Sequence, residues 1–159
     1  SALGIDPQFP PAIVAAGLIA EQNADYPGAR AQYEAALKMN PAMLVAQRQL
    51  ALLLSVRLPD DAKAYELATA IRADFQNDRQ LTKALGKIAY RRADYAEAVR
   101  LMRLASSELQ DDSDLLYHLG MAQYHVKDKS AKSTLTRAVQ LEPGARFAPE
   151  AKKAIAELK

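Results

Sequence analysis

Apolar residues recur at three- and four-residue intervals along most of the chain, and short polar or proline-containing segments interrupt them. This period is that of an amphipathic α-helix. The interruptions hold helix-breaking residues, as in Tyr26-Pro27-Gly28, Asn40-Pro41 and Glu142-Pro143-Gly144. The pattern predicts an all-α protein with helices over residues 11–23, 27–39, 42–56, 60–75, 78–92, 95–109, 113–126, 129–141 and 147–158.

Small residues recur along the chain with a period of about 34 residues. Gly17, Ala51, Gly86 and Gly120 are spaced by 34, 35 and 34 residues. Three further series follow the same period: Ala29, Ala64, Ala98 and Ala131; Ala36, Ile71, Ala105 and Ala138; and Pro41, Gln76, Gln110 and Pro143. The period accommodates two helices of about 14 residues and two tight turns. A single helical pair of this size cannot bury its apolar face, so the sequence predicts a stack of such pairs.

These positions resemble the tetratricopeptide-repeat (TPR) pattern. The last predicted repeat carries it most fully, with Leu119-Gly120, Tyr124, Ala131, Leu135, Ala138 and Pro143. The third has Leu85-Gly86, Ala93-Asp94-Tyr95, Ala98, Met102 and Ala105, and the first has Gly17, Asp25-Tyr26, Ala29, Tyr33, Ala36 and Pro41. The second is degenerate, with Leu50-Ala51, Ala64, Ala68 and Ile71.

The resemblance implies a right-handed α-α solenoid. We expect an N-terminal extension over residues 1–9 and four repeats over residues 10–143. The four repeats would cover 10–43, 44–78, 79–112 and 113–143, and a capping helix would lie within 144–159. At the crossing of the two helices of a repeat, Gly or Ala lets the backbones approach closely. Asp94 with Glu97 predicts the N-terminus of a helix.

The two ends of the predicted array differ. Residues 147–158 place apolar residues on one stripe and charges opposite, as a terminal cap requires. The first helix is apolar all round, with Ile13, Val14, Leu18 and Ile19, and its first charge is Glu21. Such a helix is normally covered on more than one side. The cover would be residues 1–10 with Leu3, Ile5 and Phe9, a missing upstream repeat, a second copy in a homodimer, or a partner. Alternatively, the alanine-rich composition only makes the helix look apolar.

In TPR proteins the first helix of each repeat lines a concave groove, so the resemblance implies a protein–protein interaction module. We interpret the chain as an adaptor or scaffold module of a larger bacterial protein. The implied groove residues are Arg48, Leu52, Lys83, Lys87, Tyr90, Arg91, Tyr117, Met121, Tyr124 and His125.

Two features of this groove suggest the chemistry of its partner. Basic residues at four-residue intervals from Arg79 to Arg91 form a like-charge stripe, which by itself destabilises the helix. Tyr117, Met121 and Tyr124 form an aromatic patch beside it, and such residues make good contact anchors. Together they favour a protein or peptide partner with acidic residues and an apolar anchor. The alternative is a solvated helix face with core tyrosines.

Two other functions stay open. Residues 79–103 hold seven basic and two acidic residues, which allows single-stranded RNA binding by the third repeat. The acidic residues that follow, from Glu108 to Asp114, would repel phosphate and make this reading the weaker one. The third possibility is self-association through the apolar first helix.

Composition narrows the chemistry. Half of the 159 residues are apolar and the formal net charge is only +2, so charge indicates neither a nucleic-acid nor a membrane binder. The absence of cysteine excludes disulfides, thiol catalysis and Cys-based metal sites. His118 and His125 supply too few ligands for a metal site. No apolar run reaches the roughly 18 residues of a membrane span. We therefore expect no enzymatic activity, cofactor, metal or membrane partner, and the location is undetermined.

Overall fold

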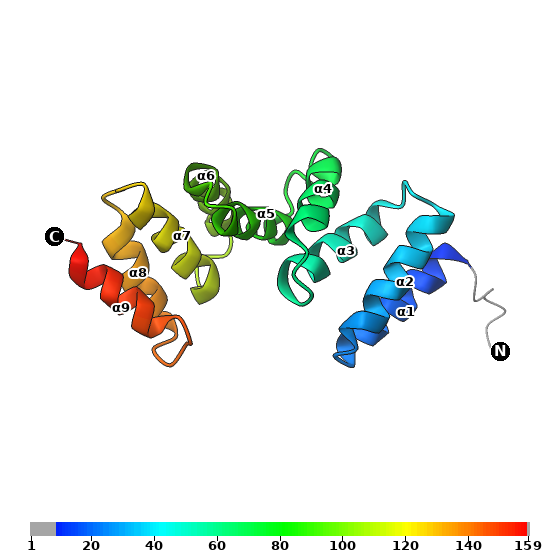
Figure 1. Cartoon of the computed structure of the whole chain (residues 1–159), viewed down its shortest axis with the longest axis horizontal. Coiled ribbons are helices and arrows are strands. Elements are labelled where there is room, and N and C mark those ends of the chain that lie inside the picture. The colour runs from blue at the N-terminus through cyan, green and yellow to red at the C-terminus, as the bar shows by residue number, and fades with distance from the viewer. Residues whose placement is uncertain (1–8, 159) are drawn as a thin grey trace. The chain divides into compact units, whose positions relative to one another are not determined.

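The computed structural model describes residues 9–158, and within them every regular element is an α-helix. The chain forms two compact units, residues 1–76 and 77–159. In the first unit lie α1 (Pro10–Gln22), α2 (Tyr26–Met39), α3 (Leu44–Val56) and α4 (Asp61–Ile71) (Figure 1). The second unit holds α5 (Arg79–Arg91), α6 (Tyr95–Ser106), α7 (Ser113–His125), α8 (Ala131–Leu141) and α9 (Ala148–Glu157). The sequence prediction of an all-α helical-repeat fold is confirmed.

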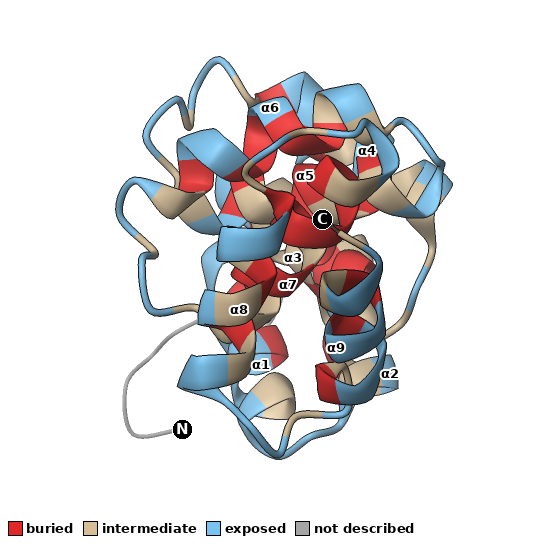
Figure 2. Ribbon diagram, turned by 90° about the vertical axis from the view of Figure 1, so that its left-hand side faces the viewer, coloured by how far each residue is buried: buried red, intermediate tan, exposed pale blue. Residues whose placement is uncertain are grey.

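Within each unit the helices pack as consecutive pairs. The most extensive contacts join α1 with α2, α3 with α4, α5 with α6 and α7 with α8. Buried residues lie on the faces that paired helices turn toward each other, while the outer faces are exposed (Figure 2). The division between the units falls after Gln76. The repeat boundaries expected from the sequence remain predictions.

Three of the pairs share one turn between their helices. The second residue after the first helix is left-handed, with φ of 58° at Ala24, 60° at Ala93 and 58° at Lys127. The backbone N–H of the next residue, an aspartate, then donates to the carbonyl five residues earlier, as in Asp94 N to Ala89 O at 2.9 Å. This is the Schellman arrangement, which satisfies carbonyls at a helix C-terminus.

The aspartate of this turn usually begins the second helix. The Asp94 side chain accepts a hydrogen bond from the backbone N–H of Glu97, as the sequence predicted, and Asp25 and Asp60 cap α2 and α4 in the same way. A carboxylate there satisfies a free N–H and offsets the helix dipole. Asp128 is the exception, because α8 receives no hydrogen bond from a side-chain cap.

The periodic small residues lie where paired helices cross. A Cβ added at Gly17 would stand 2.5 Å from Tyr33 Cε1, and one at Gly86 would stand 2.7 Å from Met102 Cγ. At Gly120 the added atom would stand 2.7 Å from Leu135. These distances are too short for any real contact, so each glycine makes room for a large side chain of the partner helix.

The predicted helices all occur, although two end earlier than expected. Helix α6 ends at Ser106 instead of residue 109. The hydroxyls of Ser106 and Ser107 donate to the carbonyls of Arg103 and Leu104 at 2.9 and 2.8 Å, and such bonds compete with the helical ladder. Helix α4 ends at Ile71 instead of residue 75, where the backbone changes to three-residue hydrogen bonds such as Asp74 N to Ile71 O.

Helix α1 is covered on one side. Ile13 and Val14 are buried, whereas Leu18 is 38 % and Ile19 57 % exposed. Leu3 and Ile5, which were expected to fold over this helix, lie outside the described residues, and Phe9 is exposed. The exposed side of α1 is therefore made by Leu18 and Ile19. Among the helices of residues 9–158, none combines the length and the apolar character needed to cross a bilayer.

Candidate partner-binding surface

The predicted groove residues lie on α3 in the first unit and on α5 and α7 in the second. On α3, Arg48 and Leu52 are half-buried, and Arg48 Nη1 donates a hydrogen bond to Gln49 Oε1 at 2.7 Å. Val45 and Val56 on the same helix are exposed. The accessible part of α3 is therefore mainly apolar.

The lysines of the basic stripe on α5 are paired within the chain. Lys83 Nζ lies 2.7 Å from Asp112 Oδ2 and 2.9 Å from Asp114 Oδ2. Lys87 Nζ lies 2.9 Å from the same Asp114 oxygen, and Arg79 Nη2 lies 2.8 Å from Glu108 Oε1. The carboxylates at and before the start of α7 thus offset the repulsion that the sequence alone predicted along α5.

The pKa values reflect this pairing. Burial alone would lower the pKa of Lys83, but its hydrogen bonds to Asp112 and Asp114 outweigh burial and raise it. Burial would raise the pKa of Asp114, but hydrogen bonds with His118, Lys87 and Lys83 outweigh it and hold the pKa well below its usual range. Both partners are charged at neutral pH. An acidic partner segment would therefore have to compete with the chain's own carboxylates for Lys83 and Lys87.

The aromatic patch is mostly covered, which differs from the expectation of an open groove. Tyr117 is 8 % and Met121 5 % exposed, and both belong to a core cluster with Ala151 and Ala154 of α9. The Tyr117 ring stacks on Phe147, with centroids 4.6 Å apart and planes at 11°. Helix α9 therefore covers most of Tyr117 and Met121, and the contact of these two residues with a partner remains a prediction.

Hydrogen bonds fix α9 against α7. Tyr117 Oη donates to Glu150 Oε2 at 2.7 Å, and Tyr124 Oη donates to the Glu157 carboxylate. Burial and the neighbouring Glu150 carboxylate raise the pKa of Tyr117, so its hydroxyl keeps the proton that it donates. The capping helix thus brings acidic side chains to the α7 face, where sequence analysis expected only polar and aromatic ones.

Aromatic rings and histidines meet beside this face. The Tyr95 and His125 rings are stacked 4.0 Å apart at 9°, and the Tyr90 ring meets His118 edge-on at 5.5 Å. His118 Nδ1 lies 2.7 Å from the Asp114 carbonyl oxygen. Within the described part of the chain, no group of three or more histidine and carboxylate side chains is placed to hold a metal ion.

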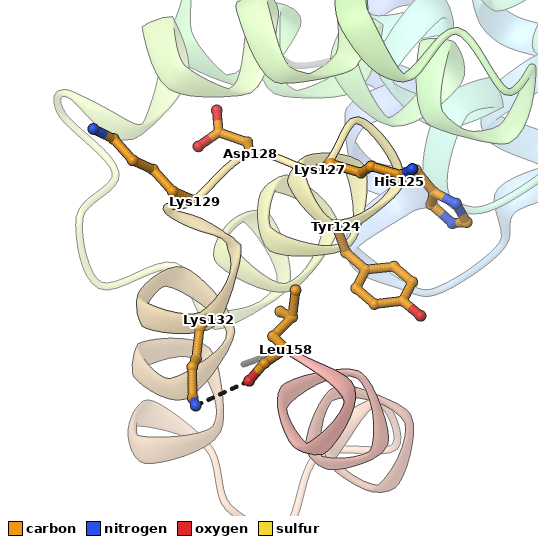
Figure 3. A pocket seen from close by; sticks show the side chains of 7 residues that line it. All are labelled: Tyr124, His125, Lys127, Asp128, Lys129, Lys132 and Leu158. Atoms are coloured by element: carbon orange, nitrogen blue, oxygen red, sulfur yellow. Dashed lines mark hydrogen bonds between the residues drawn. The ribbon is translucent and has the colours of Figure 1, made fainter.

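Two cavities adjoin at the C-terminal end of α7. The smaller one, about 240 Å³, is lined by Met121, Tyr124, His125, Glu150, Lys153, Ala154 and Glu157. The larger one, about 450 Å³, is lined by Tyr124, His125, Lys127, Asp128, Lys129, Lys132 and Leu158 (Figure 3). Tyr124 and His125 belong to both walls. Of the predicted groove residues, Met121, Tyr124 and His125 line a cavity. His125 and Arg91 are exposed, Tyr124 is half-buried and Met121 is buried.

Sequence analysis missed the contribution of α9 and of the turn before α8. Glu150 and Glu157 were assigned only to a solvating cap, and Lys127, Lys129 and Lys132 were not considered. A signal was present, since three lysines within six residues follow directly after Tyr124 and His125.

Comparison with known proteins identifies the fold. No protein-family model matches the sequence, and no curated protein matches it. Among solved structures, the chain is similar to YrrB, described as a TPR protein with an unusual peptide-binding site, at 21 % identity and a TM-score of 0.75. That match covers 96 % of this chain and 78 % of YrrB.

Two further structures give the same result. MamA matches with a TM-score of 0.78 at 18 % identity, over 96 % of this chain and 85 % of MamA. A thermophilic TPR protein of Thermus thermophilus matches with a TM-score of 0.61 at 21 % identity, over 94 % of this chain and 80 % of that one. At these identities the likeness establishes the shared fold.

Proposed function

We propose that this chain, which has the tetratricopeptide-repeat fold, is a non-catalytic protein-binding module that holds a segment of a partner protein as an adaptor or scaffold. The fold makes this class of function the natural one, since stacked helical pairs present extended surfaces for binding. The similarity to YrrB, a protein with a peptide-binding site, supports a peptide-like ligand.

The observation that carries the proposal is the cavity between α7 and α9. It combines an aromatic ring, an imidazole, two carboxylates and a lysine around about 240 Å³ of space. Converging polar and aromatic groups in a concavity are the usual features of a binding site. Tyr124 and His125, both implied by the TPR resemblance, are the residues that we expect to contact the partner.

Binding of single-stranded RNA is less favoured. The basic residues of 79–103 include Lys83 and Lys87, whose charges are offset by aspartates. Arg100 and Arg103 are likewise paired, with Glu97 and Asp128. A phosphate backbone is attracted by uncompensated cations, and these pairs reduce their number on this face.

Site-specific photo-crosslinking tests the proposal. A photoreactive phenylalanine analogue would replace Lys153, which lines the cavity, or Lys152, its exposed neighbour, which does not. In a lysate of the source organism, we expect the protein carrying the probe at position 153 to crosslink to one discrete protein. The position 152 probe should give little of this product.

The outcomes separate the alternatives. Equal products from both positions, or none from either, would remove the cavity as a binding site. A nuclease-sensitive product would instead support RNA binding. A product with twice the mass of the chain would support self-association, for which exposed Leu18 and Ile19 on α1 are the specific observation.

A further inference from the structure

The larger cavity at the end of α7 has an unusual charge arrangement. Three of its seven lining residues are lysines, which come from the turn between α7 and α8 and from the first turn of α8. Tyr124 and Leu158 add apolar surface to the wall (Figure 3). The cavity therefore offers positive charge and an apolar contact within a space of about 450 Å³.

The three lysines have no carboxylate partner among residues 9–158. Lys132 Nζ donates to the backbone carbonyl of Leu158 at 3.0 Å, and no ion pair is formed by Lys127 or Lys129 within that range. By contrast, the ammonium groups of Lys63 and Lys83 both lie 2.7 Å from a carboxylate oxygen. The charges of these two lysines are therefore neutralised by carboxylates of the chain.

The one carboxylate in the wall of this cavity is already engaged. Asp128 accepts hydrogen bonds from the backbone N–H of Ser130 at 2.8 Å and from Arg103 Nη2 at 2.5 Å. These bonds, that of the Ser130 backbone foremost, lower the pKa of Asp128. Its negative charge is offset by Arg103, so no carboxylate among residues 9–158 compensates the three lysines.

The turn before α8 does not require a lysine at position 127. Lys127 occupies the left-handed position of its turn, where the corresponding residues of two other turns are Ala24 and Ala93. A long charged side chain is therefore unnecessary for that backbone. The three lysine side chains point in different directions from the wall of the cavity, so each ammonium group offers a separate contact (Figure 3).

We propose that this cavity binds an acidic segment of the partner protein, with successive carboxylates of the segment at Lys127, Lys129 and Lys132 and an apolar side chain against Tyr124 and Leu158. The inference rests on the proposed protein-binding function and names the chemistry of the partner. Sequence analysis assigned the binding of acidic residues to Lys83 and Lys87, which are paired within the chain. The present inference assigns it to Lys127, Lys129 and Lys132, which the sequence analysis did not consider.

A peptide suits this surface better than a nucleic acid. The adjoining smaller cavity, which shares Tyr124 and His125, carries Glu150 and Glu157 in its wall. A continuous phosphate backbone would meet these carboxylates and be repelled. A peptide can place acidic residues at the lysines and neutral or basic residues at the glutamates, so the charge of the whole surface matches a segment of mixed character.

Peptide binding tests the inference. The probe is a fluorescein-labelled peptide, Gly-Ser-Leu-Glu-Glu-Leu-Glu-Gly-Ser, and its counterpart has glutamine in place of glutamate. By fluorescence anisotropy, we expect the acidic peptide to bind at least about ten-fold more tightly than the glutamine peptide, with the difference shrinking as salt is added. The variant Lys127→Glu/Lys129→Glu/Lys132→Glu should lose this preference.

The matched control is Lys38→Glu/Arg146→Glu/Lys152→Glu, which changes net charge equally at exposed positions outside the cavity. It should bind the acidic peptide within about two-fold of the wild type. Equal loss in both triple variants, or no preference for the acidic peptide, would overturn the inference. So would tighter binding of a poly-uridine oligonucleotide than of the peptide. If circular dichroism shows that the glutamate variant is unfolded, the three lysines are replaced by glutamine, and the same loss is expected.

The two proposals fail separately. Crosslinking at position 153 with unchanged peptide preference in the lysine variant would leave protein binding in place and remove only the acidic site. Absence of a crosslinked protein would remove the wider proposal.

Discussion

At the scale of single residues, the close packing of paired helices depends on a glycine, which has no Cβ, at the point where the helices cross. Gly86 faces Met102, and a Cβ at position 86 would stand 2.7 Å from Met102 Cγ and 3.4 Å from Leu101 Cβ. The side chain of Met102 is fully buried, so it has little room to move away. The close approach of α5 and α6 thus depends on the absence of a side chain.

The substitution Gly86→Ala should therefore destabilise the second unit. Overpacking of a buried contact commonly costs about 1–3 kcal/mol, which exceeds the roughly 1 kcal/mol by which alanine favours a helix over glycine. We expect a lower free energy of unfolding in urea, followed by circular dichroism. The control is Gly144→Ala, because no atom lies within 4 Å of a Cβ added there. Equal stability of the two variants would contradict this account of the periodic glycines.

The second helical pair indicates how such a clash is relieved. There Ala51 takes the place of the glycine, and the residue equivalent to Tyr33, Met102 and Leu135 is Ala68. Both alanines are buried. In this repeat the larger Ala51 replaces glycine on the first helix, and the smaller Ala68 replaces the large side chain on the second. The departure of this repeat from the TPR pattern therefore preserves the packing between its two helices. The double variant Gly86→Ala/Met102→Ala should accordingly lose less free energy of unfolding than the sum of the losses in the two single variants.

At the scale of helices, α5 and α7 are joined by a small charge network. Asp114 accepts hydrogen bonds from Lys87 at 2.9 Å and lies 3.2 Å from His118 Nδ1. Asp112 binds Lys83 and also accepts the backbone N–H of Leu115 at 2.8 Å. One aspartate therefore caps α7 and anchors α5 at the same time, so that loss of these carboxylates would affect both helices.

Stability should fall in acid partly through Asp114. The pKa of Asp114 is lowered in the folded state, against about 3.9 for an unfolded aspartate. A lowered folded pKa contributes stability that is present above pH 4 and is lost as the pH falls further toward the folded value. We expect Asp114→Asn to be less stable than wild type at pH 7, with the difference shrinking below pH 4. Urea unfolding across this range measures it.

Asp111→Asn is the control for this experiment. Asp111 is three residues away and pairs with Arg137, but its side chain is 80 % exposed, so the pair is well screened. Its substitution should change stability little at any pH. A constant difference between Asp114→Asn and wild type from pH 7 to pH 2 would show that Asp114 acts through packing and not through its charge.

The spacing of apolar residues predicted which helices form, but it did not predict the ion pairs and hydrogen bonds between them. Nine helices and the small crossing residues could be predicted because both depend on local period. The pairs Lys83–Asp112 and Arg79–Glu108 each span 29 residues, and they form only when successive helices are stacked. Tyr117–Glu150 and Tyr124–Glu157 each span 33 residues, close to one repeat. These contacts would be expected if α9 occupied the position of the first helix of a further repeat, and they are not expected of a helix that serves only as a solvent-facing cap.

At the scale of the whole chain, the first and the last described helix differ in their outer faces. Helix α9 buries Ala148, Ala151 and Ala154 and exposes charged residues. Helix α1 instead exposes Leu18 and Ile19, beside exposed Phe9. A polar outer face is typical of a helix that ends a repeat array, and α9 has such a face, whereas α1 exposes apolar side chains. A second copy of the chain is the cover that is testable with the protein alone.

Substitution of Ile19 tests this cover. We expect wild type to form a dimer whose proportion rises with concentration in sedimentation velocity, and Ile19→Glu to shift it toward monomer, because a buried charge without a partner is strongly unfavourable. Met39→Glu is the control, since Met39 is similarly exposed, at 51 % against 57 %, but lies at the end of α2. It should sediment as wild type does. A wild type that is monomeric at every concentration would exclude a second copy as the cover. Equal effects of both variants would show that association does not use α1, and Leu18 and Ile19 would then be left for a different partner.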